Sequence, residues 1–227
     1  LERITFTPDT SLLGKIGMGN FTAAEAIAEL VANSFDARVY IDEDLNTEPL
    51  TVEIIVETDR IVIRDNGVGM NAKVLQGALT LAKDMDSVTG NTRKRMGLFG
   101  LGMKSASSSL GKAWSIATKE ADAEFPIGVK FDLEKFAESQ EWSEDLFEYQ
   151  AGDENPLADF EHGTAIVITN LHHKSPGTGP IFDLLGTAYT PLLEKGHNEI
   201  LVNNDEVLKK PYDLIPDSKV LVNRVLA

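Results

Sequence analysis

The sequence contains no cysteine, which excludes disulfide bonds, thiolate catalysis and cysteine-ligated zinc. It also has no apolar run near the roughly 20 residues that a membrane-spanning helix needs. The N-terminus lacks the charged and then apolar pattern of a secretory signal peptide. We therefore expect a soluble, cytoplasmic protein. A hydrophobic content of 42% in 227 residues is enough for one substantial core.

Basic residues are also scarce, with 21 Lys and Arg against 36 Asp and Glu and a net charge of -15. This deficit argues against a surface that attracts nucleic acid, so we expect such contact only through other domains, if at all. Most of the excess lies in residues 120–161, where 14 acidic residues accompany two lysines. We expect the part of it between the strands at 125–132 and 164–170 to protrude, and the acidic surface of residues 120–161 to offer a site to a protein partner. In contrast, residues 83–119 carry seven Lys and Arg against two Asp, which suits a polyanion such as a triphosphate.

Hydrophobic periodicity and turn residues divide the chain into helices and strands without internal repeats. A helix should begin at the capping-box sequence Thr22-Ala-Ala-Glu25 and run to about residue 38. The other expected elements are strands at 51–57, 60–64, 113–119, 125–132 and 164–170, helices at 71–82, 101–110 and 181–194, and a hairpin at 199–208. The polar, aperiodic residues 83–100 predict a long loop that acts as a lid.

One face of the first helix is polar. Glu29, Asn33 and Asp36 are spaced so that all three lie on one side, opposite the apolar residues. A side-chain amide can give its oxygen to a hard cation, and a glutamate one turn earlier can align a water for attack on phosphorus. The alternative is an ordinary solvated helix face, which the spacing taken alone favours.

The sequence Asp65-Asn-Gly-Val-Gly69 follows a predicted strand. A carboxylate at a strand end, followed by two glycines that let the backbone approach a flat ligand, suits the exocyclic amine of adenine. The alternative is a simple tight turn, because Asn and Gly are the usual turn residues.

A glycine-rich segment, Gly97-Leu-Phe-Gly100-Leu-Gly102-Met-Lys104, precedes a predicted helix. A Walker A loop would place lysine directly after glycine, but Met103 intervenes. A Rossmann loop would join a first strand to its helix within a repeated βαβ pattern, which is absent. Backbone amides at a helix N-terminus with a lysine nearby still form an anion site for phosphates. The alternative is a flexible loop.

Taken in order, Glu29 to Ala37, Asp65 to Met70, Gly97 to Ala106 and Gly163-Thr164 resemble four motifs of the GHKL superfamily. This superfamily includes the gyrase B subunit, the ninety-kilodalton heat-shock chaperone, histidine kinases, MutL and Microrchidia proteins. The third motif is closest in form to Microrchidia and heat-shock-type members, whereas the Asn-Ser-x-Asp-Ala phrase of the first also suits MutL.

The resemblance implies a Bergerat-type ATP-binding fold, an α/β (α+β) two-layer sandwich with helices on one face of a mixed, largely antiparallel sheet. It implies ATP and magnesium as cofactors, Glu29 as the general base and Asn33 as the magnesium ligand. Asp65 would read adenine, and Thr164 would support it through its hydroxyl or a water. The nucleotide-binding residues that it implies are Asn33, Asp36, Asp65, Gly67, Gly69, Met70, Lys83, Gly97, Gly100, Gly102, Lys104 and Thr164.

Histidine kinases generally lack a water-activating glutamate at the position of Glu29, so hydrolysis is favoured over kinase activity. We expect magnesium-dependent ATP hydrolysis that drives lid closure and homodimerisation of the ATP-bound form. The alternative is an ATP-gated interaction module with negligible hydrolysis. Residues 1–200 should form the ATP-binding domain, and residues 201–227 a C-terminal extension or the start of a following domain. Because such a domain supplies a γ-phosphate cation in several members, turnover in isolation should be slow.

Overall fold

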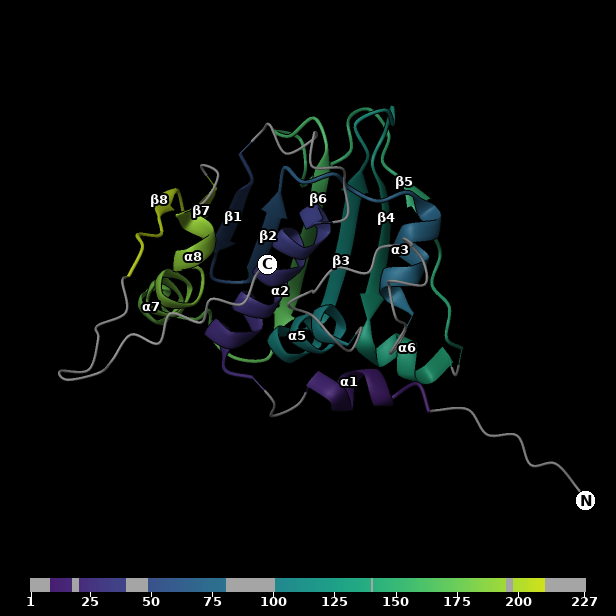
Figure 1. Ribbon diagram of the computed structural model, residues 1–227. Helices are drawn as coiled ribbons and strands as arrows, with labels where there is room; N and C mark the ends of the chain where they lie inside the picture. Colours follow the sequence, from purple (N-terminus) through teal and green to yellow (C-terminus); the bar gives the residue numbers. More distant parts are fainter. Residues whose placement is uncertain are drawn as a thin grey trace, which may run out of the picture.

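The computed structural model describes residues 9–17, 21–39, 49–80, 101–139, 141–194 and 198–210, which contain an 8-stranded sheet (Figure 1). The strands are β1 Thr51–Val56, β2 Arg60–Asp65, β3 Gly111–Lys119, β4 Ile127–Asp132, β5 Phe147–Glu148, β6 Gly163–Leu171, β7 Glu199–Val202 and β8 Asp205–Glu206. Their order is β5-β4-β3-β6-β2-β1-β7-β8, and every pair is antiparallel except β1 with β7. The predicted mixed, largely antiparallel sheet is confirmed.

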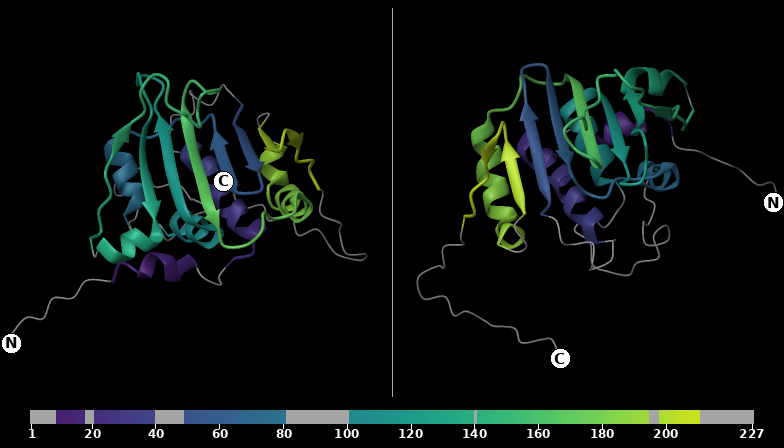
Figure 2. Two further views of the ribbon diagram at one scale, coloured as in Figure 1. Left: turned by 180° about the vertical axis from the view of Figure 1, so that it is seen from behind. Right: turned by 90° about the horizontal axis from the view of Figure 1, so that it is seen from above.

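Helices cover one face of this sheet. They are α1 Leu12–Gly17, α2 Ala23–Val39, α3 Ala72–Leu79, α5 Gly102–Leu110, α6 Leu133–Ser139, α7 Thr178–Ala188 and α8 Thr190–Leu193. The view from behind in Figure 2 shows the strands in front of α2 and α5, so the architecture is the predicted two-layer sandwich. None of the helices in the described ranges is both long and apolar enough to cross a membrane.

The central helix α2 begins where the sequence predicts. The backbone N–H of Thr22 donates to Glu25 Oε2 over 2.7 Å, and the N–H of Glu25 donates to Thr22 Oγ1 over 3.3 Å. This reciprocal pair is the capping box, which satisfies two amides that a helix N-terminus leaves unbonded. The inner face of α2 is buried over Ala26, Ile27, Leu30 and Val31. The helix is therefore fixed against the sheet along its length.

The predicted helix after Asn71 is also present as α3, with the Asn71 side chain accepting from the N–H of Val74 over 3.1 Å. It ends at Leu79, three residues before its expected end. The predicted lid loop, residues 83–100, lies outside the described residues.

Two transverse rows of large apolar side chains form the floor beneath α2 and α5. Register across β2, β6 and β3 places Ile61, Ile168 and Trp114 in one row and Ile63, Ile166 and Ile116 in the next. All six belong to the main core cluster together with the inner face of α2. Such alternation of apolar and outward-facing residues fixes the register of all three strands, because a slip by one residue would reverse every side chain.

The prediction that the acidic interval protrudes is wrong for residues 147–160. This segment lies across the face of the sheet opposite α2, where Tyr149 and Leu157 pack on Ala117 and Ala165. Arg64, on the same face, donates to the carbonyl oxygen of Pro156 over 3.2 Å. Tyr149 and Leu157 anchor the segment to the sheet, while its carboxylates stay exposed.

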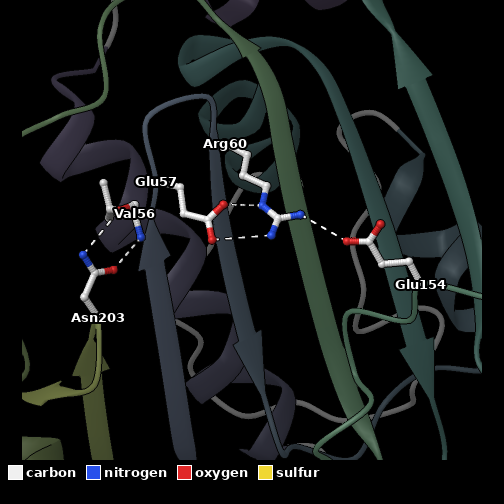
Figure 3. A network of polar contacts seen from close by, with 5 residues as sticks. All are labelled: Val56, Glu57, Arg60, Glu154 and Asn203. Atoms are coloured by element: carbon white, nitrogen blue, oxygen red, sulfur yellow. Dashed lines mark hydrogen bonds and ion pairs between the residues drawn. The ribbon is translucent and has the colours of Figure 1, made fainter.

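The predicted C-terminal hairpin is present as β7 and β8, and it belongs to the main sheet. Its turn residues Asn203 and Asn204 have φ of 50° and 71°, the left-handed region that asparagine tolerates. Asn203 Oδ1 accepts from the N–H of Val56 over 2.7 Å, which extends the pairing of β7 with β1 (Figure 3). A boundary after residue 200 would fall inside β7, whereas the sheet continues to Glu206.

Candidate nucleotide site

A polar row continues the two apolar rows on the helix-covered face of the sheet. Asp65 on β2 lies opposite Thr164 on β6, which lies opposite Thr118 on β3. Asp65 and Thr118 are buried, at 6% and 0% exposure, and Thr164 is half-buried. A dry apolar floor that ends in hydrogen-bonding groups is the pattern of a small-molecule site.

The Asp65 carboxylate is held by donors from three parts of the chain. Ser34 Oγ on α2 donates to Oδ2 over 2.7 Å, and the Gly67 N–H donates to Oδ1 over 2.9 Å. Burial raises the pKa of Asp65, while bonds from Ser34 and from the amides of Gly67 and Thr164, and the nearby His162, act to lower it. Three of the four lone pairs of the carboxylate are thus occupied, and one remains for an incoming donor such as an amine.

The turn after Asp65 requires its glycines. Gly69 has φ of +68°, and a Cβ there would come within 1.9 Å of the Lys119 carbonyl oxygen. A Cβ at Gly67 would approach Asp65 Oδ1 to 2.7 Å. The backbone at both positions therefore packs too closely for a side chain, and the N–H of Met70, next along, donates to Thr118 Oγ1 over 2.8 Å.

Three residues that stabilise this turn were not predicted as site residues. The sequence predicts no role at the site for Ser34, Thr118 or His162. His162 Nδ1 lies 2.6 Å from the Gly67 carbonyl oxygen, so the ring nitrogen must donate. The register could not be known from the sequence, but Thr118 stands out as a polar residue in the inward-facing series of its strand.

The polar face of α2 holds the predicted catalytic and metal residues. Asn33 Nδ2 donates to the Glu29 carbonyl oxygen over 2.7 Å, so the amide nitrogen is used and its oxygen is the end that can take a cation. Burial, followed by the charge of Asp36, raises the pKa of the Glu29 carboxyl. Both carboxylates also help to raise the pKa of Tyr189, whose hydroxyl donates to the Ala28 carbonyl oxygen over 2.6 Å. This side of α2 is thus a region of concentrated negative charge, which favours a cation.

Gly102, the first residue of α5, lies directly against Glu29. A Cβ at Gly102 would come within 1.9 Å of Glu29 Oε1. Among the residues that the structure describes, no side chain caps the N-terminus of α5, and the N-cap residue Leu101 makes no side-chain hydrogen bond there. The first amides of this helix are therefore available to an anion next to Glu29.

Lys104 in the first turn of α5 is directed elsewhere. Its side chain is buried, and Nζ donates to the carbonyl oxygens of Ala78 over 2.6 Å and Thr80 over 3.2 Å, at the end of α3. Burial lowers its pKa to about 8. The amine thus caps α3 in this structure, and its predicted phosphate contact stays a prediction. The remaining predicted residues, Lys83, Gly97 and Gly100, lie outside the described residues.

Two cavities lie away from these motifs. One, of about 440 Å³, is lined by residues such as Ser115, Lys130 and Val167 on the opposite face of the sheet. The other, of about 360 Å³, lies beside Phe21 and His172. Neither is lined by Asp65, Thr164 or Glu29.

Comparison with known proteins agrees with this arrangement. Residues 20–164 match the profile of a family described as histidine kinase-, DNA gyrase B-, and HSP90-like ATPases. The chain belongs to this family. A curated relative of this chain, the mouse MORC family CW-type zinc finger protein 3, is 35% identical over 99 residues. That stretch is 43% of this chain and 10% of the relative, so the similarity concerns a small part of the mouse protein.

The donor set on α2 can be compared with the needs of magnesium. Within the described ranges no group of three or more His, Cys, Asp or Glu side chains could hold a metal. Magnesium is usually held by one or two protein oxygens, substrate phosphates and water. The amide oxygen of Asn33 is the protein ligand that the α2 geometry offers.

Proposed function

We propose that this chain binds ATP with magnesium and hydrolyses it. The main support for the proposal is that one helix, α2, contributes residues to both ends of the site. Ser34 donates to Asp65 at the polar end of the sheet, and Glu29 lies against Gly102 at the start of α5. These contacts arise five residues apart, about 7.5 Å along the helix axis, so a bound nucleotide could meet both of them along one helix.

At the purine end, Asp65 would accept from the exocyclic amine of adenine, and Thr164 would assist directly or through a water. Gly67, Gly69 and Met70 form the close backbone wall of that end. At the phosphate end, Asn33 would hold magnesium, which when bound neutralises phosphate charge. Glu29 would accept a proton from the attacking water, Asp36 would border the nucleotide, and the first amides of α5 at Gly102 would bind phosphate oxygens.

Lid closure over the nucleotide, through Lys83, Gly97, Gly100 and Lys104, is part of the same proposal, as is homodimerisation of the ATP-bound form. We place the ATP-binding domain at least as far as β8, because β7 pairs with β1 within the sheet. A cytoplasmic location and a partner on the acidic surface of residues 120–161 remain expectations. Any nucleic-acid contact would come through other domains.

Nucleotide binding and turnover test this function directly. Calorimetry with ATP and magnesium should show binding, and Asp65→Asn should weaken it by about tenfold, the loss expected for one net hydrogen bond. Glu29→Ala should keep ATP affinity but lower turnover by roughly 10²–10⁴-fold. Normal turnover in Glu29→Ala would remove Glu29 from the mechanism, and unchanged affinity in Asp65→Asn would contradict the adenine assignment.

The alternative, an ATP-gated interaction module with negligible hydrolysis, shares the binding site and differs in chemistry. A single-turnover experiment with excess protein and magnesium separates the two. Conversion of bound ATP to ADP in the wild type but not in Glu29→Ala supports the ATPase, and equal persistence of ATP in both proteins supports the gated module.

A further inference from the structure

Thr118 is the most deeply buried member of the polar row, and neither the motifs nor the family assignment gives it a role. Its hydroxyl contacts three groups. It accepts from the Met70 N–H over 2.8 Å, donates to the Gly163 carbonyl oxygen over 3.1 Å, and lies 3.1 Å from the Thr164 hydroxyl. It therefore joins the turn after Asp65 to the start of β6.

The direction of these bonds follows from counting protons. A hydroxyl has one proton to donate, a backbone N–H can only donate and a carbonyl oxygen can only accept. If all three contacts are made together, the Thr118 proton lies on the Gly163 oxygen. The proton between the two hydroxyls must then come from Thr164. Both lone pairs of the Thr164 oxygen, on a half-buried side chain beside Asp65, are then left as acceptors.

We propose that Thr118 is a positioning residue that makes the purine end of the site select 6-aminopurines over 6-oxopurines. The inference rests on the proposed function, because it takes Asp65 and Thr164 as the groups that meet the base. With Thr118 in place, both present acceptors, which suit the amine of adenine. The 6-oxo group of the other purines is itself an acceptor and would face the acceptors of Asp65 and Thr164. Buried polar groups left without a hydrogen bond in this way lower the affinity for the 6-oxopurine.

Removal of the Thr118 hydroxyl tests this. In Thr118→Val the Thr164 proton loses its acceptor and becomes free to donate to a 6-oxo group. Calorimetry should therefore show wild type preferring ATP to inosine triphosphate by about tenfold or more, and Thr118→Val should lose most of that ratio. Thr118→Ser, which keeps a hydroxyl, should retain it. If Thr118→Val melts below the assay temperature, Thr118→Cys, whose thiol is a weak hydrogen-bonding group, should show the same loss.

A matched control is Thr169→Val on the same strand as Thr164, whose hydroxyl is 3.5 Å from the Ala113 carbonyl oxygen on the opposite face. It should keep the wild-type ratio. A wild-type ratio in both Thr118→Val and Thr118→Cys would overturn the inference and leave the proposed function standing. Failure of the wild type to bind ATP would instead overturn the proposed function, and the inference with it.

Discussion

The carboxylate of Glu29 lies over the α-carbon of Gly102, so that a Cβ on Gly102 would stand 1.9 Å from Glu29 Oε1. The contact joins α2 to the N-terminus of α5, and the absent side chain is what allows the approach. The obstructing atom is the far end of a flexible side chain, so a methyl group here would turn the carboxylate aside while the backbone stays in place.

We predict that Gly102→Ala lowers ATP turnover by roughly 100-fold, the low end of the range for losing a general base, because the displaced Glu29 no longer aligns water. Alanine favours helix more than glycine, so thermal stability should not fall greatly. Steady-state turnover and a thermal melt measure both quantities.

Gly179→Ala provides the matched control for that variant. Gly179 also lies in the first turn of a helix, α7, and nothing lies within 4 Å of the position that its Cβ would take. Its turnover should equal that of the wild type. Equal turnover in the two glycine variants would show that Glu29 is not held in place by the contact with Gly102.

Lys104 predicts a pH dependence of stability. Burial lowers its pKa from 10.5 to about 8. Between these values the unfolded chain binds the proton more tightly, so the free energy of unfolding should rise with pH. In Lys104→Met this contribution is absent. As the pH rises from 7.5 to 9.5, the melting temperature of the wild type should therefore rise by a few degrees relative to that of Lys104→Met. This follows from a change of about 2–4 °C in melting temperature per kcal/mol of stability.

The comparison between wild type and Lys104→Met removes the effect of the other titrating groups, which both proteins share. Melting curves that keep a constant separation across this pH range would show that the Lys104 amine is exposed, as a phosphate-binding lysine would be before its ligand arrives.

Arg64 and Arg60, both on β2, should differ in their effect on stability. The Arg64 side chain is 15% exposed and pairs with Glu53 at 2.7 Å, whereas Arg60 is 40% exposed between Glu57 and Glu154 (Figure 3). Arg64→Ala should lower the free energy of unfolding by about 1–3 kcal/mol, because it leaves a partly buried carboxylate without its cation. Arg60→Ala should change it by about 0.5 kcal/mol or less. Urea titrations yield both values, and similar losses for the two would contradict the burial argument.

The capping box at the start of α2 should contribute measurably to the fold. Thr22→Ala removes the hydroxyl that accepts from the Glu25 N–H and should cost about 1 kcal/mol. Thr22→Ser retains an acceptor and should cost much less. A loss in Thr22→Ser equal to that in Thr22→Ala would mean that the threonine methyl group, and not the hydroxyl, stabilises the helix start.

Local signals were enough to predict most elements. Capping at Thr22 and Asn71, alternation in β2, β3 and β6, and the paired asparagines before β8 each act within a few residues. The prediction that the acidic interval protrudes was wrong because Tyr149 and Leu157 are too widely spaced to form a periodic pattern. Their burial depends on a sheet face that three separate segments assemble.

The site was predicted only as far as its motifs reach. Asp65, Gly69 and Asn33 are recognisable by residue type and spacing, and their roles stay predictions. Thr118 and His162 are not recognisable in this way, because their contacts with the turn join segments 48 and 95 positions apart. The direction of the Lys104 side chain was likewise decided by the end of α3, which no local pattern specifies.

The parallel pairing of β1 with β7 has a consequence for synthesis on the ribosome. The Leu50 N–H reaches the side chain of Asn198, 148 positions later in the chain, and the pairing runs on through residue 202. A nascent chain that has not yet exposed this hairpin leaves the β1 edge open, and an open edge invites association with another chain. Nascent chains arrested with residue 190 outside the exit tunnel should be sensitive to protease and prone to aggregation. Those with residue 210 outside should be resistant to protease. Equal resistance at both lengths would show that the sheet closes without its last two strands.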